Sequence, residues 1–224
     1  MGKIDEFEQK IIKQGMTDAD FMEYEKLLKR VRGNFSKRQH CYITAIQFPR
    51  QYAEQAVKLI QYGLENYEDN WLSTYTSYLH MGHIYEGISN YQKAFEVYLL
   101  AKEALGLDHP EYVEELSKDL MWMKLHVDSF KYSVELEEYL SCYEKTSDFS
   151  KSFVNAEFKV AIANIVISMH HGRFDEAKQF LEKAKSICKP NNVGKLYNIL
   201  DRHNYKESFK TTREAEDFIK NIIL

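Results

Sequence analysis

The chain has 224 residues and a formal net charge of −4, so its charge predicts no general attraction to nucleic acid or to an anionic membrane. Its nine glycines and three prolines are less than half of the average share of about 12%, which argues against a turn-rich β-sandwich or barrel. Aromatic residues make up 14% of the chain; this excludes intrinsic disorder, because disordered segments are poor in large apolar side chains.

The N-terminal residues carry many charges and include no apolar core of a signal peptide. Three widely spaced cysteines, Cys41, Cys142 and Cys188, suit a reducing compartment. The longest apolar stretch, 160–169, is about half of the ~20 residues that a bilayer crossing needs. We therefore expect a cytoplasmic protein with no membrane segment.

The first part of the chain, 1–34, is expected to form a cap of two short helices. The second of these should run over 18–32, with Thr17 as its N-cap. Pro49 then precedes a helix that begins near Gln51, and Pro110 and Pro190 stand at later junctions, where a proline can open the first turn of a helix.

The clearest pattern covers two helices in the middle of the chain. Apolar residues recur at steps of three and four over 75–86 and again over 91–105, which predicts two helices with one buried face each. The short link 87–90 supplies Gly87 as a C-cap and Asn90 as an N-cap. Two helices joined so briefly form an αα-hairpin.

A similar pair is predicted at 158–171 and 172–188, where Gly172 marks the turn. The tail, 191–224, should hold two more helices, with Thr211 or Thr212 capping the last one. A stripe of apolar residues on that last helix can close the end of the array: Ala215, Phe218, Ile219 and Ile222.

Large and small residues alternate through the hairpin in a recognisable order: Tyr78, Met81, Gly82, Tyr85, Tyr91, Ala94, Tyr98 and Ala101. The later pair repeats the second half of that order: Phe174, Ala177, Leu181 and Ala184. In these residues the chain resembles tetratricopeptide repeat proteins, and 104–110 is similar to the link between repeats of the longer, kinesin light chain-like type.

The small residue of each second helix gives the repeat length. Ala56, Ala94, Leu136 and Ala177 follow one another at intervals of 38, 42 and 41 residues, and Ala215 would begin a further, partial unit. Leu136 departs from the pattern because it is large. The resemblance implies an all-α, TPR-like α-solenoid of about four hairpins over 35–190, closed by the caps 1–34 and 191–224. The alternative is an irregular helical bundle with accidental matches.

Motifs for chemistry are few in this sequence. It contains no phosphate-binding loop and no GxSxG elbow. His80, His83 and Glu86 share a helix at steps of three, whereas catalytic zinc helices place their two histidines four apart. The basic run 29–38 is interpreted as a solvated loop, with an acidic partner or nucleic acid as the alternative. We therefore expect no catalysis, no metal or other cofactor, and no nucleic acid partner.

The resemblance implies a non-catalytic module that holds a protein or peptide in the concave groove lined by its first helices. The candidate partner-binding residues at these positions are Arg38, Thr76, His83, Glu86, Lys118, Met121, Asp128, Lys159 and Met169. The Lys and Asn pattern of the carboxylate clamp that holds chaperone C-termini is absent, so a cochaperone role is not expected.

Two more specific roles stay open within this class: a peptide-responsive bacterial regulator and a partner that neutralises a toxin. An alternative from another class, ranked behind both, is a hydrolase that uses His83 and Glu86. The sequence fixes neither the partner's identity nor the oligomeric state.

Overall fold

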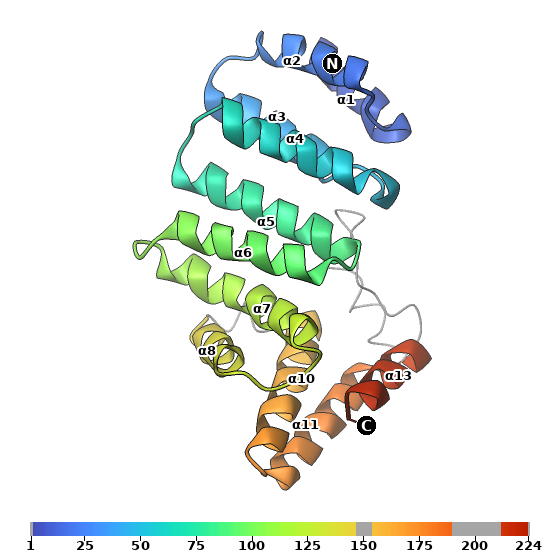
Figure 1. Ribbon diagram of the computed structural model, residues 1–224, viewed down its shortest axis with the longest axis vertical. Coiled ribbons are helices and arrows are strands. Elements are labelled where there is room, and N and C mark those ends of the chain that lie inside the picture. The colour runs from blue at the N-terminus through green and yellow to red at the C-terminus, as the bar shows by residue number, and fades with distance from the viewer. Residues whose placement is uncertain (1, 147–153, 190–211, 224) are drawn as a thin grey trace. The chain divides into compact units, whose positions relative to one another are not determined.

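Helices make up all the secondary structure of the described residues, 2–146, 154–189 and 212–223, in a computed structural model of the chain (Figure 1). Within these ranges there are eleven α-helices and one short 3₁₀-helix, so the all-α prediction is confirmed. The described residues divide into two compact units, one up to Gly106 and one that begins at Leu107. Among the described helices, none combines the length and apolar character that a bilayer crossing demands.

Six α-helices and the 3₁₀-helix η1 (Arg50–Tyr52) form the first unit. The α-helices are α1 (Lys3–Gln14), α2 (Asp18–Leu28), α3 (Asn34–Ala45), α4 (Ala53–Asn66), α5 (Trp71–Gly87) and α6 (Tyr91–Leu105). They pack as successive pairs, α1 with α2, α3 with α4, and α5 with α6, while α3 also contacts both α1 and α5 (Figure 1). One apolar core runs through them, including Ile11 of α1, Tyr24 of α2 and Ile84 of α5.

The second unit contains α7 (Pro110–Val127), α8 (Val134–Tyr143), α10 (Val154–His170), α11 (Phe174–Ile187) and α13 (Thr212–Ile223). Here α7 pairs with α8 and α10 with α11, and α10 also packs against α7 and α8. Phe218 joins α13 to this group, because its ring centroid lies 5.9 Å from that of Trp122 and 5.3 Å from that of Phe130.

Several predicted helix ends are confirmed. Thr17 caps α2, since its hydroxyl accepts a hydrogen bond from the Asp20 amide at 3.1 Å and the Asp20 carboxylate accepts one from the Thr17 amide at 3.1 Å. Pro110 occupies the first turn of α7. The predicted helix 18–32 is too long, because α2 ends at Leu28. Beyond it, the amides of Arg30 and Val31 donate to the carbonyl groups three residues earlier, as in a turn, and not four residues earlier, as in an α-helix.

The basic run 29–38 is also corrected, because it extends from the loop after α2 into α3, which begins at Asn34. Helices α1 and α2 share their core with α3 to α5, and the first compact unit ends at Gly106. The division into a cap over 1–34, repeats over 35–190 and a cap over 191–224 stays a prediction. Pro190, Thr211 and the first of the two predicted tail helices lie outside the described residues.

The link between α5 and α6 follows the prediction in all but one residue. Asn90 caps α6, with its side-chain oxygen accepting from the Lys93 amide at 3.3 Å. The residue in the left-handed region is Ser89, with φ of 59°, and Gly87 remains within α5. The expected glycine C-cap is therefore wrong, and a serine takes up the unfavourable backbone conformation.

The close contact of α5 with α6 depends on the missing side chain of Gly82. A Cβ atom placed on Gly82 would overlap the ring of Tyr98, which is fully buried. The pair α3–α4 uses the same device, because a Cβ on Gly63 would lie 2.9 Å from the Cβ of Cys41. Gly82 therefore lies where the paired helices α5 and α6 approach closely.

Replacing Gly82 with alanine should therefore destabilise the protein. Overpacking a buried site costs ~1–3 kcal/mol, and the better helix propensity of alanine returns up to about 1 kcal/mol of this. We expect a net loss of about 1–2 kcal/mol in the free energy of unfolding, measured by urea denaturation. In a double-mutant cycle with Tyr98→Leu the two changes should couple strongly; simple additivity would contradict the contact.

Replacing Ser89 with glycine should have the opposite effect. Glycine adopts φ of 59° without the Cβ clash that serine suffers there, so we expect a gain of about 0.5–1 kcal/mol in unfolding free energy. The matched control is Ser141→Gly, at an exposed position inside α8, which should lose a similar amount. Equal effects of the two changes would refute the left-handed backbone conformation of Ser89.

Candidate functional site

Four of the nine predicted partner-binding residues are buried. Arg38, Glu86, Met121 and Lys159 are each at most 4% exposed. Arg38 donates from Nη1 to the hydroxyl of Thr74 at 2.7 Å. These four side chains do not line an open groove, because they are enclosed within the protein.

The other five are at least partly exposed but are spread over both units. Thr76 and His83 on α5 are half-buried, as are Lys118 on α7 and Asp128, the residue that follows α7. Asp128 forms an ion pair with Lys124 at 3.3 Å. Met169 at the end of α10 is 44% exposed.

The histidines of α5 pack against aromatic rings. His80 stacks on Tyr42 of α3, with ring centroids 5.5 Å apart, and the edge of His83 meets Tyr98 of α6 at 5.8 Å. The buried carboxylate of Glu86 accepts a hydrogen bond from the Tyr98 hydroxyl at 3.0 Å. His80, His83 and Glu86 thus help to join helices, and Glu86 is not presented to a substrate in solvent.

A buried ion pair links α7 to α10. Lys159 Nζ lies 3.4 Å from Asp119 Oδ1 and 5.5 Å from the centroid of the Trp122 ring. Because removing one partner leaves an uncompensated buried charge, such pairs are costly to break. Lys159 therefore helps to hold α7 and α10 together, and its charge is not presented to solvent.

An open pocket of about 370 Å³ lies among α4, α5 and α6 in the first unit. Its apolar lining consists of Leu64, Tyr78, Met81, Tyr85, Val97 and Leu100, and its polar residues are Gln61, Glu65, Lys93 and Glu96. We call this the α4–α6 pocket. Its exposed apolar member is Leu100, with 40% of its surface accessible, so a partner could cover apolar area here.

Charges surround the tyrosines of the α4–α6 pocket. Lys93 places its ammonium 5.5 Å from the centroid of the Tyr85 ring. Burial raises the pKa of Tyr85, and the negative charges of Glu54 and Glu96 raise it further. The hydroxyl therefore stays protonated and can donate a hydrogen bond. Three carboxylates, those of Glu54, Glu65 and Glu96, are exposed in or beside the pocket.

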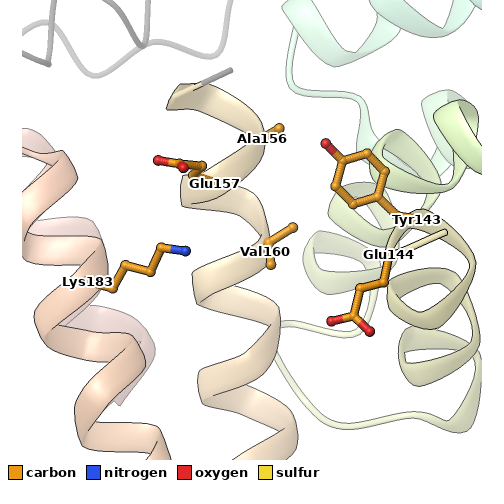
Figure 2. Close-up of a pocket in the computed structure, with 6 residues that line it drawn as sticks. All are labelled: Tyr143, Glu144, Ala156, Glu157, Val160 and Lys183. Atoms are coloured by element: carbon orange, nitrogen blue, oxygen red, sulfur yellow. The ribbon is translucent and has the colours of Figure 1, made fainter. Parts of the chain in front are cut away.

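The second unit contains another pocket, of about 420 Å³, bounded by α8, α10 and α11. Figure 2 shows Ala156 and Val160 of α10 facing Tyr143 and the end of α8, while Lys183 extends from α11 toward α10. Burial raises the pKa of Tyr143 to about 12, and the nearby charge of Asp119 adds to the effect. This pocket offers a neutral phenol on its wall.

A further pocket of about 460 Å³ in this unit includes Met169, the one predicted residue that lines any of these three cavities. Tyr132 and His170 lie on its wall, and their rings are stacked with the centroids 3.7 Å apart. Glu137 accepts hydrogen bonds from Tyr132 at 3.2 Å and bonds to His171 at 2.6 Å. Through these two bonds Glu137 links Tyr132 of the aromatic wall to His171, the residue after His170.

Sequence reasoning missed the α4–α6 pocket because the resemblance directed attention to the first helix of each pair. Most of the pocket belongs to α4 and α6, the second helices. One signal was present: Leu100 is an apolar residue on the otherwise polar side of 91–105.

One group of three metal-type donors occurs among the described residues, formed by Asp5 and Glu8 of α1 and His40 of α3. Their donor atoms all lie within 4.8 Å of one another. This group was not expected from the sequence, because its members come from helices far apart in the chain.

Searches of protein-family models, of curated proteins and of solved structures found no match for the chain. The similarity to tetratricopeptide repeats therefore depends on the residues described above.

An aromatic cluster in the second unit keeps one histidine neutral. His126 lies with its ring centroid 4.7 Å from that of Trp122 and 4.9 Å from that of Phe130. Burial lowers its pKa to about 3, and the positive charge of Lys159 contributes in the same direction.

Stability should therefore fall as the pH drops from about 6.5, the ordinary histidine pKa, toward the folded value of about 3. In this window the unfolded chain binds a proton at His126 and the folded chain does not, so proton binding stabilises the unfolded state and lowers the free energy of unfolding. His126→Phe should flatten the pH profile of the urea-derived unfolding free energy, by up to ~2 kcal/mol near its acid end. An unchanged pH profile in His126→Phe would contradict the assignment of a neutral, buried His126.

Proposed function

We propose that this protein is a non-catalytic, TPR-like helical-repeat module that binds a protein or peptide. The repeat positions support the proposal. Ala56, Ala94, Leu136 and Ala177 each lie on the second helix of a pair, α4, α6, α8 and α11, and each is at most 5% exposed. Equivalent residues thus have equivalent burial, as stacked repeats require. A cytoplasmic location fits the three free cysteines.

The α4–α6 pocket is the observation on which the binding function depends. It lies between two successive helix pairs and combines aromatic and aliphatic walls with a polar rim. Its volume of about 370 Å³ falls in the range of ligand pockets, and an amphipathic segment can insert one or two side chains into such a groove. Aromatic side chains such as Tyr78 and Tyr85 are common anchors of binding energy.

Charge indicates the chemistry of the partner. Glu54, Glu65 and Glu96 outnumber Lys93, whose ammonium is already placed over Tyr85. Like charges across an interface are unfavourable and opposite charges speed association. The partner is therefore a peptide segment with a large apolar residue for the pocket and a lysine or arginine next to it.

The proposed surface differs from the groove expected along the first helices. In the first unit, the predicted groove residues Arg38 and Glu86 are enclosed, whereas Leu100 on α6 remains accessible. A partner that approaches α4 and α6 can bury Leu100 without any rearrangement of the helix pairs.

Leu100→Asp tests the pocket directly. Peptides would be selected from a displayed random library against the full chain, and their affinities measured by fluorescence anisotropy. We expect sequences with an apolar residue beside a basic one, and a loss of affinity of at least about tenfold in Leu100→Asp, since truncating an interface anchor costs more than ~1 kcal/mol.

Leu72→Asp is the matched control. Leu72 is 40% exposed, as Leu100 is, but it lies outside the pocket near the start of α5. Peptides that bind Leu100→Asp as tightly as the unchanged chain would refute the pocket, and a library that yields no binder would refute the function.

A further inference from the structure

We propose that Asp5, Glu8 and His40 form a binding site for a divalent transition metal ion, Zn²⁺. The site lies on the first unit, where α1 meets α3, and is separate from the α4–α6 pocket. Its donor atoms lie within 4.8 Å of one another, and His40 Nδ1 is 2.8 Å from Glu8 Oε1.

The donor types and spacing suit zinc. This ion binds imidazole nitrogen and carboxylate oxygen at about 2.0–2.2 Å, so two donors in a tetrahedral shell are ~3.3 Å apart. His40 and Glu8 need to separate by only about half an ångström to share an ion, which a change of side-chain torsion provides. Zinc also stands high among divalent metals in affinity for mixed nitrogen and oxygen sites.

The charges of the site match the ion. Two carboxylates and a neutral imidazole carry two negative charges, which a divalent cation neutralises. Without metal, the same carboxylates stabilise the protonated imidazole of His40. Zn²⁺ binding replaces the proton on Nδ1, which leaves to solvent, so the site is occupied by either one cation or the other.

Neighbouring groups hold the donors in position. Asp5 and Glu8 are three residues apart on α1, so they share a face. Tyr24 of α2, which is fully buried, donates to Glu8 Oε1 at 2.7 Å, and the Gly2 amide donates to Asp5 Oδ2 at 2.7 Å. Such outer contacts orient metal ligands and raise affinity.

The site is open to solvent. All three ligands are only partly buried, and three protein ligands leave a fourth position of the zinc shell for water. This arrangement resembles neither a closed structural site nor a surface patch of acids, since an imidazole from another helix completes it. Metal binding would clamp α1 onto α3 and so stabilise the contact between the first helix pair and the second.

The test is isothermal titration of ZnCl₂ into the full chain after treatment with a chelator. We expect one ion per chain, with affinity weakened by at least about tenfold in His40→Gln and in Asp5→Asn. Both replacements keep a polar group that can hydrogen-bond to the same neighbours. Zn²⁺ should also raise the melting temperature of the unchanged chain and not that of His40→Gln.

His171→Gln is the control. His171 forms a close pair with Glu137 at 2.6 Å but belongs to no three-donor group among the described residues, so its loss should leave the titration unchanged. Absence of Zn²⁺ binding overturns the proposal, as does binding that survives in both His40→Gln and Asp5→Asn. If His40→Gln fails to fold by circular dichroism, Asp5→Asn alone decides the outcome.

Discussion

Close approach of two helices at a glycine is the constraint on which two pairs of the first unit, α3–α4 and α5–α6, depend. Gly82 lets the ring of Tyr98 lie against α5, and Gly63 admits the side chain of Cys41 between α3 and α4. Because the two helices of a pair approach closely at the glycine, large side chains such as Tyr98 lie beside the contact and fill the space around it. The buried hydroxyl of Tyr98 then finds its acceptor in Glu86, so one glycine determines the environment of both.

The same packing explains why a surface pocket forms where it does. The second helices α4 and α6 lie on either side of α5, and the pocket that they border is floored by tyrosines and a methionine of α5. A pocket of this kind arises from stacking and not from a loop, so it is built on rigid elements. The side chains that it presents to solvent are few, and Leu100 and the surrounding carboxylates are the most prominent of them.

Local features of the fold could be predicted from the sequence, whereas the environments of the site residues could not. Thr17 and Asn90 act through neighbours three residues away, so their roles follow from the sequence alone. Arg38 and Lys159 act through partners 36 and 40 residues away. A helical pattern says which residues share a face but not which element covers that face. The burial of charged residues that were expected in a groove, such as Arg38 and Lys159, could therefore not be predicted from the pattern.

The thiol of Cys41 provides a built-in reporter of these helix contacts. It is fully buried against Gly63, and burial, together with the charge of Glu8, raises its pKa well above the ordinary value. Alkylating reagents attack the thiolate, so Cys41 can react only when α3 and α4 transiently separate. Its rate of alkylation therefore measures local opening of that pair without any introduced label, while the half-buried Cys142 supplies an internal reference from the other unit.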